Sequence, residues 1–472
     1  VIEALSDEDK NSKIKLSLAK AYSHIDEFDK TIEILESIKE SESNTSIWNY
    51  CMGHSYYYLD DISEAERYLL KALEINPEDK PSIFLLALLY HELGDIDDAQ
   101  KAIHYLNKSL NYFNTYSNLG ADEDITEDLI SIEQKLAWNY DKLKNHKEAE
   151  IHLRKAISLG DNEEWVFSQL AYNLRSQERY EEALEYYLKA LELSEDDIFI
   201  MSDIAWLYDI TDRYEEALKY LERLEELGQD DSWTNTEFGF CLSRLKRYEE
   251  ALEKINRALE ADEEDKDMSY IYSQLGFCKK QLEEYDEAIE DFNQAKKWGR
   301  NDAWINFEIA ICYENLEDYE KALEYALISY ELDKDEVNVL SEIGWLYNYM
   351  GKYEDALPFL LKAQELGRND EGINTEIAVS LGRSGNVKEA IEKLKKSLTM
   401  VDQNDINQRI FINSELGWYY GKLEEPHPEE ALKYLNIAKD LGREDAWLYS
   451  QIAYQLGYNS ETKNEALEYF DK

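Results

Sequence analysis

Residues 180–184 read Tyr-Glu-Glu-Ala-Leu, and the same five residues return at 214–218 and at 248–252, in steps of 34 residues. The alanine of this stretch, which we call the anchor, marks a repeat through most of the chain, and most of the steps between anchors are 34 residues. The anchors are Ala65, Ala99, Ala149, Ala183, Ala217, Ala251, Ala288, Ala322, Ala356, Ala390, Ala431 and Ala466, with Thr31 in the equivalent place at the front. The chain therefore consists of about thirteen copies of one small unit.

The residues before each anchor also recur. Leu or Ile stands thirteen residues earlier, Gly or Ala twelve earlier, Tyr or Leu nine earlier, and usually Tyr three earlier; Leu170, Ala171, Leu174 and Tyr180 precede Ala183 in this way. Because successive residues of a helix advance by about 100°, the large residues share one face, and the small residue lets a second backbone approach. Each unit is therefore predicted to be a hairpin of two helices.

This pattern resembles the tetratricopeptide repeat (TPR) family, whose 34-residue unit carries a Leu-Gly pair, a following Tyr, and then Ala and an aromatic residue. The family's closing Pro remains only at Pro77, and its early Trp is mostly displaced. The resemblance covers nearly the whole chain. It implies an all-α fold, a right-handed superhelical solenoid of about 13 TPR-like helical hairpins, in which the first helix of each pair lines a concave groove.

Two segments differ in regularity. Residues 1–122 are predicted to be N-terminal repeats with an irregular insertion near 100–122, which we expect to lengthen two helices and not to form a hinge. Residues 123–472 are predicted to be an array of five double repeats of about 68 residues, because alternate units carry a glycine eleven residues after the anchor. A glycine there suits a left-handed helix cap. These glycines are Gly160, Gly228, Gly299, Gly367 and Gly442.

Tryptophan follows the same alternation. The glycine-ended units place it eleven residues before the anchor, at Trp138, Trp206, Trp345 and, allowing for a small insertion, Trp418, with Phe277 substituting in the third. The other units place it eighteen before, at Trp165, Trp233 and Trp304, with Trp447 in the equivalent place of the last unit and Gly372 as the exception. Between these two positions, fifteen before the anchor, a hydroxyl residue recurs; examples are Ser202, Thr236, Ser341 and Thr375. All three positions fall on one helical stripe.

Two interpretations of this stripe are open. The tryptophans either fill the seams between adjacent first helices or anchor an extended or helical segment of another protein, because Trp and Tyr dominate binding hot spots. The candidate protein- or peptide-binding residues are Trp138, Trp165, Trp206, Trp233, Trp304, Trp345, Trp418 and Trp447, with Ser202, Thr236, Ser341 and Thr375 bonding a ligand backbone. The expected function is a protein-interaction scaffold; the alternatives are a sensor or regulatory arm of a larger enzyme and a structural spacer.

The formal net charge is −51, and much of it lies in the two residues before each anchor, such as Glu181 and Glu182. Carboxylates in the first turn of a helix interact favourably with its positive end, so a structural role is expected for these pairs. The remaining negative charge argues against nucleic acid as a partner, because phosphate binding needs clustered Lys and Arg.

No catalytic, cofactor or metal pattern is found, so the chain is not expected to be an enzyme. The four cysteines are widely spaced, and three of them sit ten residues before an anchor, as packing residues would. No apolar run is long enough to cross a membrane, and a cytoplasmic protein is expected. The last hairpin has no following helix to cover Ile452, Leu456, Leu467 and Phe470. Such an apolar end is expected to find another surface: further repeats, a fused domain, or a second copy of the chain in end-to-end self-association.

Overall fold

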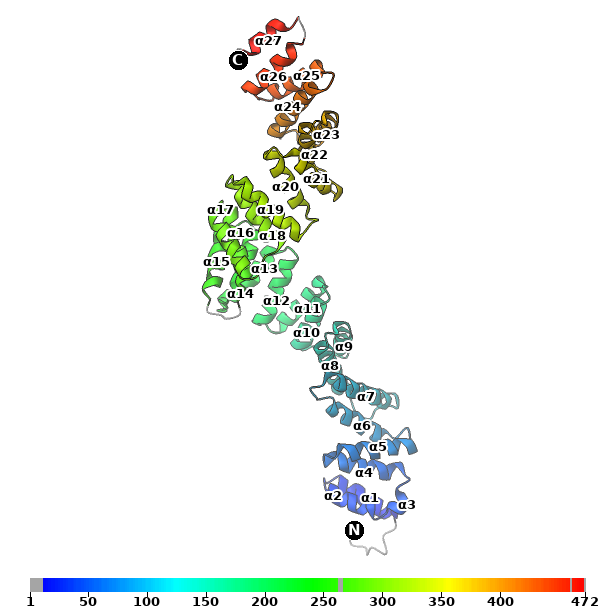
Figure 1. Ribbon diagram of the computed structural model, residues 1–472. Coiled ribbons are helices and arrows are strands. Elements are labelled where there is room, and N and C mark those ends of the chain that lie inside the picture. The colour runs from blue at the N-terminus through cyan, green and yellow to red at the C-terminus, as the bar shows by residue number, and fades with distance from the viewer. Residues whose placement is uncertain (1–11, 262–265, 459–460, 471–472) are drawn as a thin grey trace. The chain divides into compact units, whose positions relative to one another are not determined.

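The computed structural model describes residues 12–261, 266–458 and 461–470, and every regular element within these ranges is an α-helix (Figure 1). The helices follow one another as thirteen antiparallel pairs, with one additional single-turn helix, α3 (Lys39–Glu42), between the first two pairs. The predicted all-α solenoid of helical hairpins is confirmed. The contacts divide the chain into two compact units, residues 1–227 and 228–472.

The first unit holds six hairpins. Their helices are α1 (Ser12–Ser23) with α2 (Phe28–Glu36), α4 (Ser46–Tyr58) with α5 (Ile62–Ile75), α6 (Lys80–Leu93) with α7 (Ala99–Asn118), α8 (Thr126–Lys142) with α9 (His146–Ser158), α10 (Glu164–Arg175) with α11 (Tyr180–Leu193), and α12 (Ile198–Ile210) with α13 (Tyr214–Glu226). Within this unit, the second helices of the first five hairpins also pack on the first helix of the next hairpin, for example α9 on α10 and α11 on α12.

The second unit holds seven hairpins. Their helices are α14 (Ser232–Arg244) with α15 (Tyr248–Glu260), α16 (Met268–Gln281) with α17 (Tyr285–Lys297), α18 (Ala303–Asn315) with α19 (Tyr319–Leu332), α20 (Val337–Tyr349) with α21 (Tyr353–Glu365), α22 (Glu371–Arg383) with α23 (Val387–Met400), α24 (Ile406–Lys422) with α25 (Pro428–Asp440), and α26 (Ala446–Leu456) with α27 (Lys463–Phe470). The predicted division at residue 122 concerns the repeat pattern and stays a prediction.

The anchors lie in the core of every hairpin. Ten of the alanines and Thr31 have no exposed surface, and Ala99 and Ala466 are buried to at least nine-tenths. The small residue twelve positions earlier lies directly against the second helix. At Gly276, an added Cβ atom would lie 2.8 Å from Cδ1 of Phe292, which is four residues beyond the anchor Ala288. The predicted close approach of the two helices is therefore present.

Helix ends also follow the sequence. Gly367 has a φ of +108°, a left-handed conformation that side chains with a Cβ rarely adopt, and the other four predicted cap glycines also have positive φ. The acidic pairs before the anchors lie in the first turns of second helices, as Glu181 and Glu182 do in α11. Their structural placement therefore agrees with a favourable interaction with the helix dipole.

The insertion before residue 122 lengthens two helices. α7 has 20 residues and α8 has 17, whereas most first and second helices of the chain have 13 or 14. Phe113 and Tyr116 of the added turns are buried in a core that they share with α6 and α8. Aromatic residues of this segment thus contribute to packing inside the first unit.

We expect Gly276→Ala to destabilise the second unit. Overpacking against Phe292 costs about 1–3 kcal/mol, which outweighs the roughly 1 kcal/mol that alanine gains over glycine in a helix. The matched control is Gly372→Ala, also in a first helix, where the new Cβ atom would meet only Oδ1 of Asp370, at 3.2 Å. The midpoint of urea unfolding should fall for the first variant and hold or rise for the control; equal midpoints would contradict the close packing at Gly276.

Candidate functional site

The first helices of the hairpins form the candidate binding face. Within the second unit, α14 contacts α16, α16 contacts α18, and α20, α22, α24 and α26 contact one another in turn; within the first unit, α4 contacts α6. First helices of neighbouring hairpins therefore lie side by side. Every tryptophan of the alternating pattern is on one of these helices.

The eight patterned tryptophans differ in exposure. Trp138 is 45% exposed and Trp233 is 40% exposed, and the other six are half-buried. The two tryptophans outside the pattern are at the extremes, because Trp48 is 1% exposed and Trp298 at the end of α17 is 58% exposed. The patterned rings thus form a graded series in which none is sealed inside a hairpin.

The half-buried rings lie at the seams between consecutive hairpins. Trp206 in α12 packs edge-on against Tyr180 of α11, with ring centres 6.0 Å apart, and the guanidinium of Arg175 lies 5.2 Å from the Trp206 ring centre. Arg383 at the end of α22 lies 3.9 Å from the ring centre of Trp418 in α24. Such cation–π contacts contribute roughly 0.5–1 kcal/mol when exposed. These rings therefore pack against the preceding hairpin and still present part of their surface to solvent.

The hydroxyl residues of the stripe bond to their own helices. Ser202, Thr236, Ser341 and Thr375 each donate a hydrogen bond to the carbonyl oxygen four residues earlier, at 2.7–2.8 Å. Thr236, Ser341 and Thr375 are buried, and only Ser202 is partly exposed. These side chains thus lie on the predicted stripe, and each hydroxyl proton is already used in a hydrogen bond within its own helix. Their predicted role toward a ligand backbone stays a prediction.

A row of carboxyl groups on the first helices was not anticipated from the sequence. Each such group faces a side chain from the preceding first helix. Lys280 pairs with Glu308, Nδ2 of Asn348 donates to Oε2 of Glu376 at 2.8 Å, and Arg383 pairs with Glu415 with Nη2 and Oε1 2.9 Å apart. The signal was present in the sequence, because Glu308 and Glu376 stand fourteen residues before their anchors.

At one step of this row the facing residue is a second acid. The carboxyl groups of Glu314 in α18 and Glu342 in α20 interact directly, and because two adjacent carboxylates repel each other, the pair favours a state with one shared proton. Burial, together with the nearby charge of Glu314, raises the pKa of Glu342 to about 8. Glu342 lines a cavity of about 280 Å³ in the second unit, whose wall consists of Glu314, Ser341, Glu342, Trp345, Leu360, Arg368, Gly372, Ile373 and Glu376.

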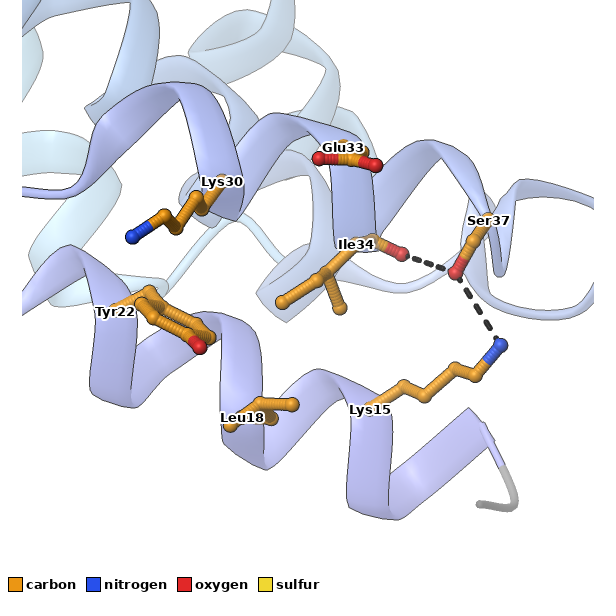
Figure 2. A pocket seen from close by; sticks show the side chains of 7 residues that line it. All are labelled: Lys15, Leu18, Tyr22, Lys30, Glu33, Ile34 and Ser37. Carbon is orange, nitrogen blue, oxygen red and sulfur yellow. Dashed lines mark hydrogen bonds between the residues drawn. The ribbon is translucent and has the colours of Figure 1, made fainter. Parts of the chain in front are cut away.

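A second cavity, of about 370 Å³, lies between α1 and α2 (Figure 2). Nζ of Lys15 donates to Oγ of Ser37 at 3.5 Å, and Nζ of Lys30 lies 5.5 Å from the ring centre of Tyr22 and 3.4 Å from Oε2 of Glu27. Both lysines therefore already have partners. No predicted site residue lines this cavity, and we place the candidate site on the tryptophan-bearing first helices.

The remaining reactive side chains are placed as packing groups. Burial raises the pKa of the Cys51 thiol to about 11 and those of Cys278 and Cys312 to about 12, so these thiols are held in the unreactive neutral form. Among the described residues, no set of three or more His, Cys, Asp or Glu side chains is placed to bind a metal ion. No helix in the same part of the chain has both the length and the apolar character needed to cross a membrane.

Sequence profiles described as tetratricopeptide repeat match residues 47–79, 68–101, 134–162, 162–230, 230–297 and 337–370, which together amount to just over half of the chain. The chain belongs to the tetratricopeptide repeat family. The family and the fold suggest a scaffold for protein–protein interaction, and TPR proteins are typically non-catalytic and bind protein or peptide partners. No curated protein matches the sequence as a relative.

Several solved structures are similar to this chain at low identity. A TPR protein from Parabacteroides merdae is 19% identical, with 54% of this chain and 99% of that chain covered and a TM-score of 0.43. YrrB, described as a TPR protein with an unusual peptide-binding site, is 22% identical, with 40% and 94% covered and a TM-score of 0.35. A chain of the APC/C hetero-tetramer Cut9–Hcn1 is 14% identical, with 96% and 92% covered and a TM-score of 0.39.

The raised pKa of Glu342 predicts a pH dependence of stability. The folded protein keeps this proton up to about pH 8, whereas the unfolded chain loses it near the ordinary value of 4.5, so the stability contributed by the group is complete below that value and is lost as the pH rises through 8. Each unit of pKa shift corresponds to about 1.4 kcal/mol. We expect Glu342→Gln, which keeps a neutral side chain, to reduce the loss of stability between pH 5 and 9 in urea unfolding.

The matched control for this measurement is Glu354→Gln, which removes an exposed carboxyl group in the first turn of α21. Both variants remove one ionisable carboxyl group from the unfolded chain, so the self-repulsion of that state is altered equally. A pH dependence that is identical in the two variants would contradict the assignment of a shared proton to the Glu314–Glu342 pair.

Proposed function

We propose that the first-helix face of each unit binds an extended or helical segment of a partner protein, with the patterned tryptophans as anchors. The observation that carries this proposal is the exposure of Trp138 and Trp233 on first helices, at 45% and 40%. A bulky indole that is neither buried nor needed in the hairpin core is typical of a binding hot spot. The half-buried rings at the seams add apolar surface along the same face.

The contacts of the exposed rings support a role outside packing. The only ring or cation contact found for Trp138 within the described residues is with Lys142 of its own helix, whose Nζ lies 5.8 Å from the ring centre. By contrast, Trp206 and Trp418 each have partners from the preceding hairpin. Truncating Trp138 therefore removes accessible apolar surface and leaves the contacts between hairpins in place.

We expect the double variant Trp138→Ala/Trp233→Ala to lose binding without losing the fold. Peptides selected on the wild-type protein from a displayed random library serve as ligands, and their affinities are measured by fluorescence anisotropy. Truncating two anchors should weaken the best peptides by at least about tenfold, since hot-spot residues contribute more than about 1 kcal/mol each. The thermal midpoint should change little, because Trp138 and Trp233 are already 45% and 40% exposed in the folded protein.

The matched control is Trp298→Ala, which removes a tryptophan that is more exposed, at 58%, at the end of the second helix α17 and outside the pattern. It should leave peptide affinity unchanged. Equal losses in the two variants would indicate non-specific capture by exposed indoles, and unchanged affinity in the double variant would remove Trp138 and Trp233 from the site.

Self-association through the C-terminal hairpin is a separate proposal. Tyr454 and Tyr458 of the α26 end and Leu467 of α27 are 54%, 49% and 57% exposed, and they line an apolar hollow of about 450 Å³. The side chain of Phe470, predicted to share this surface, lies outside the described residues. A contiguous exposed apolar surface favours association.

We therefore expect Leu467→Asp to reduce the self-association of the chain. Light scattering coupled to gel filtration should show a concentration-dependent rise in mass for the wild type and less of it for this variant. The control is Leu332→Asp, which places the same charge on a leucine that is 51% exposed at the end of α19. A wild-type mass that stays monomeric over the range studied would contradict the proposal.

A further inference from the structure

Three loops of the second unit carry the same short motif. Each begins with the cap glycine, continues with Arg, and has Asp three residues after the glycine and the patterned tryptophan position two residues later. The motif reads Gly-Arg-Asn-Asp-Ala-Trp at 299–304, Gly-Arg-Asn-Asp-Glu-Gly at 367–372 and Gly-Arg-Glu-Asp-Ala-Trp at 442–447. The middle copy therefore keeps the arginine and the aspartate and lacks only the indole.

The arginine is held in the same way in all three copies. Its Nε lies 2.8–2.9 Å from Oδ2 of the aspartate two residues later, and Oδ1 of that aspartate caps the following first helix; the three pairs are Arg300 with Asp302, Arg368 with Asp370, and Arg443 with Asp445. In the first and third copies the guanidinium lies over the tryptophan ring, 5.0 Å from the centre of Trp304 and 4.3 Å from that of Trp447. In the middle copy Gly372 provides no ring.

The contacts of Trp304 show which side chains surround an indole at this position of the repeat. Its ring lies 6.3 Å from the ring of Phe277 in the preceding first helix and 6.0 Å, edge-on, from that of Phe292 in the preceding second helix. Arg300 completes the enclosure. An indole at this position is thus bordered by one side chain from each of three successive elements: a first helix, a second helix and the loop after it.

Side chains at the corresponding positions also surround Gly372, which has no ring of its own. The double repeats anchored at Ala288 and Ala356 correspond at a spacing of 68 residues, so the counterparts of Phe277, Phe292 and Arg300 are Trp345, Leu360 and Arg368. All three line the cavity of about 280 Å³, together with Gly372 itself. The cavity therefore occupies the place that an indole fills in the equivalent repeat.

We infer that this cavity binds a tryptophan side chain supplied by a segment of a partner protein. This inference rests on the proposed binding face, because Trp345 belongs to the same first-helix stripe. The size fits, since a cavity of about 150 Å³ already admits a benzene ring. Trp345 and Leu360 provide apolar walls, and the guanidinium of Arg368 can stack on the ring as its counterparts do.

The polar wall selects a ring that carries a hydrogen-bond donor. Its carboxyl groups, from Glu314, Glu342 and Glu376, are hydrogen-bond acceptors. An indole N–H can donate to such a group, and a phenyl ring has no donor. Trp48 shows the same preference in the first unit, where its Nε1 donates to the carbonyl oxygen of Leu35 at 2.9 Å.

The test uses N-acetyl-L-tryptophanamide, which presents the side chain with a neutral backbone, in titration calorimetry with the full chain. Wild-type protein and Gly372→Ala should bind it alike, because the new Cβ atom leaves the cavity open. Gly372→Trp restores the ring found in the other two copies, so binding should weaken at least about tenfold and the thermal midpoint should rise. N-acetyl-L-leucinamide should bind at least about tenfold more weakly than the tryptophan amide.

A second variant keeps the inference testable if Gly372→Trp does not fold. Trp304→Gly creates the same cavity in the neighbouring double repeat; it should lower the thermal midpoint, add a binding site, and regain stability when the tryptophan amide is added. Equal binding by wild type and Gly372→Trp, or no binding by either protein, would overturn the inference. Much tighter binding of free L-tryptophan would instead identify a small-molecule site and also overturn it.

These outcomes separate the cavity from the broader proposal. Peptides that still depend on Trp138 and Trp233, in a protein that does not bind the tryptophan amide, would leave the first-helix face as the binding surface and remove only the cavity. Binding of the amide without any peptide dependence on those two residues would retain the cavity and contradict their role as anchors.

Discussion

The close contact between the two helices of each hairpin is the constraint on which the rest of the structure depends. A small residue on the first helix, such as Gly276, lies against the second helix at a distance that leaves no room for another carbon atom without a shift of Phe292. Contact at this distance fixes how the helices face each other. Because the anchor and this small residue keep a separation of twelve residues in all repeats but the last two, any other position counted from the anchor has the same surroundings from one of these repeats to the next.

That regularity explains which features could be predicted from the sequence. The buried anchors, the left-handed cap at Gly367 and the acidic first turn of α11 depend only on residues within one hairpin, and all were predicted. The placement of the tryptophans on first helices was predicted from their distance in sequence from the anchor. Their partial burial did not, since the exposure of Trp206 is decided by Tyr180 and Arg175 of the preceding hairpin.

The row of carboxyl groups on the first helices shows even more clearly that contacts between hairpins could not be predicted from one repeat alone. Whether an acid on a first helix is paired depends on the residue that the preceding first helix places opposite it, 28 positions earlier for Glu308, Glu342 and Glu376. Lys280, Glu314 and Asn348 occupy those places, and the outcomes differ accordingly: an ion pair, a shared proton and an amide hydrogen bond. Repeat periodicity predicts the position of each acid, and the chemistry at that position is set by one residue of its neighbour.

An exception within a regular series is informative for the same reason. Gly372 interrupts the tryptophan pattern, but Arg368, Asp370 and Ser341 around it are kept as in the repeat of Trp304. An empty space and a buried, protonated carboxyl group both cost stability, and a compact globular core would transmit that cost throughout the domain. In a solenoid each hairpin contacts only its neighbours, so the cost falls on one seam. The array can therefore carry an incomplete seam at Gly372 without disturbing the packing of distant hairpins, which makes a single interrupted repeat a position where a ligand group can complete the packing.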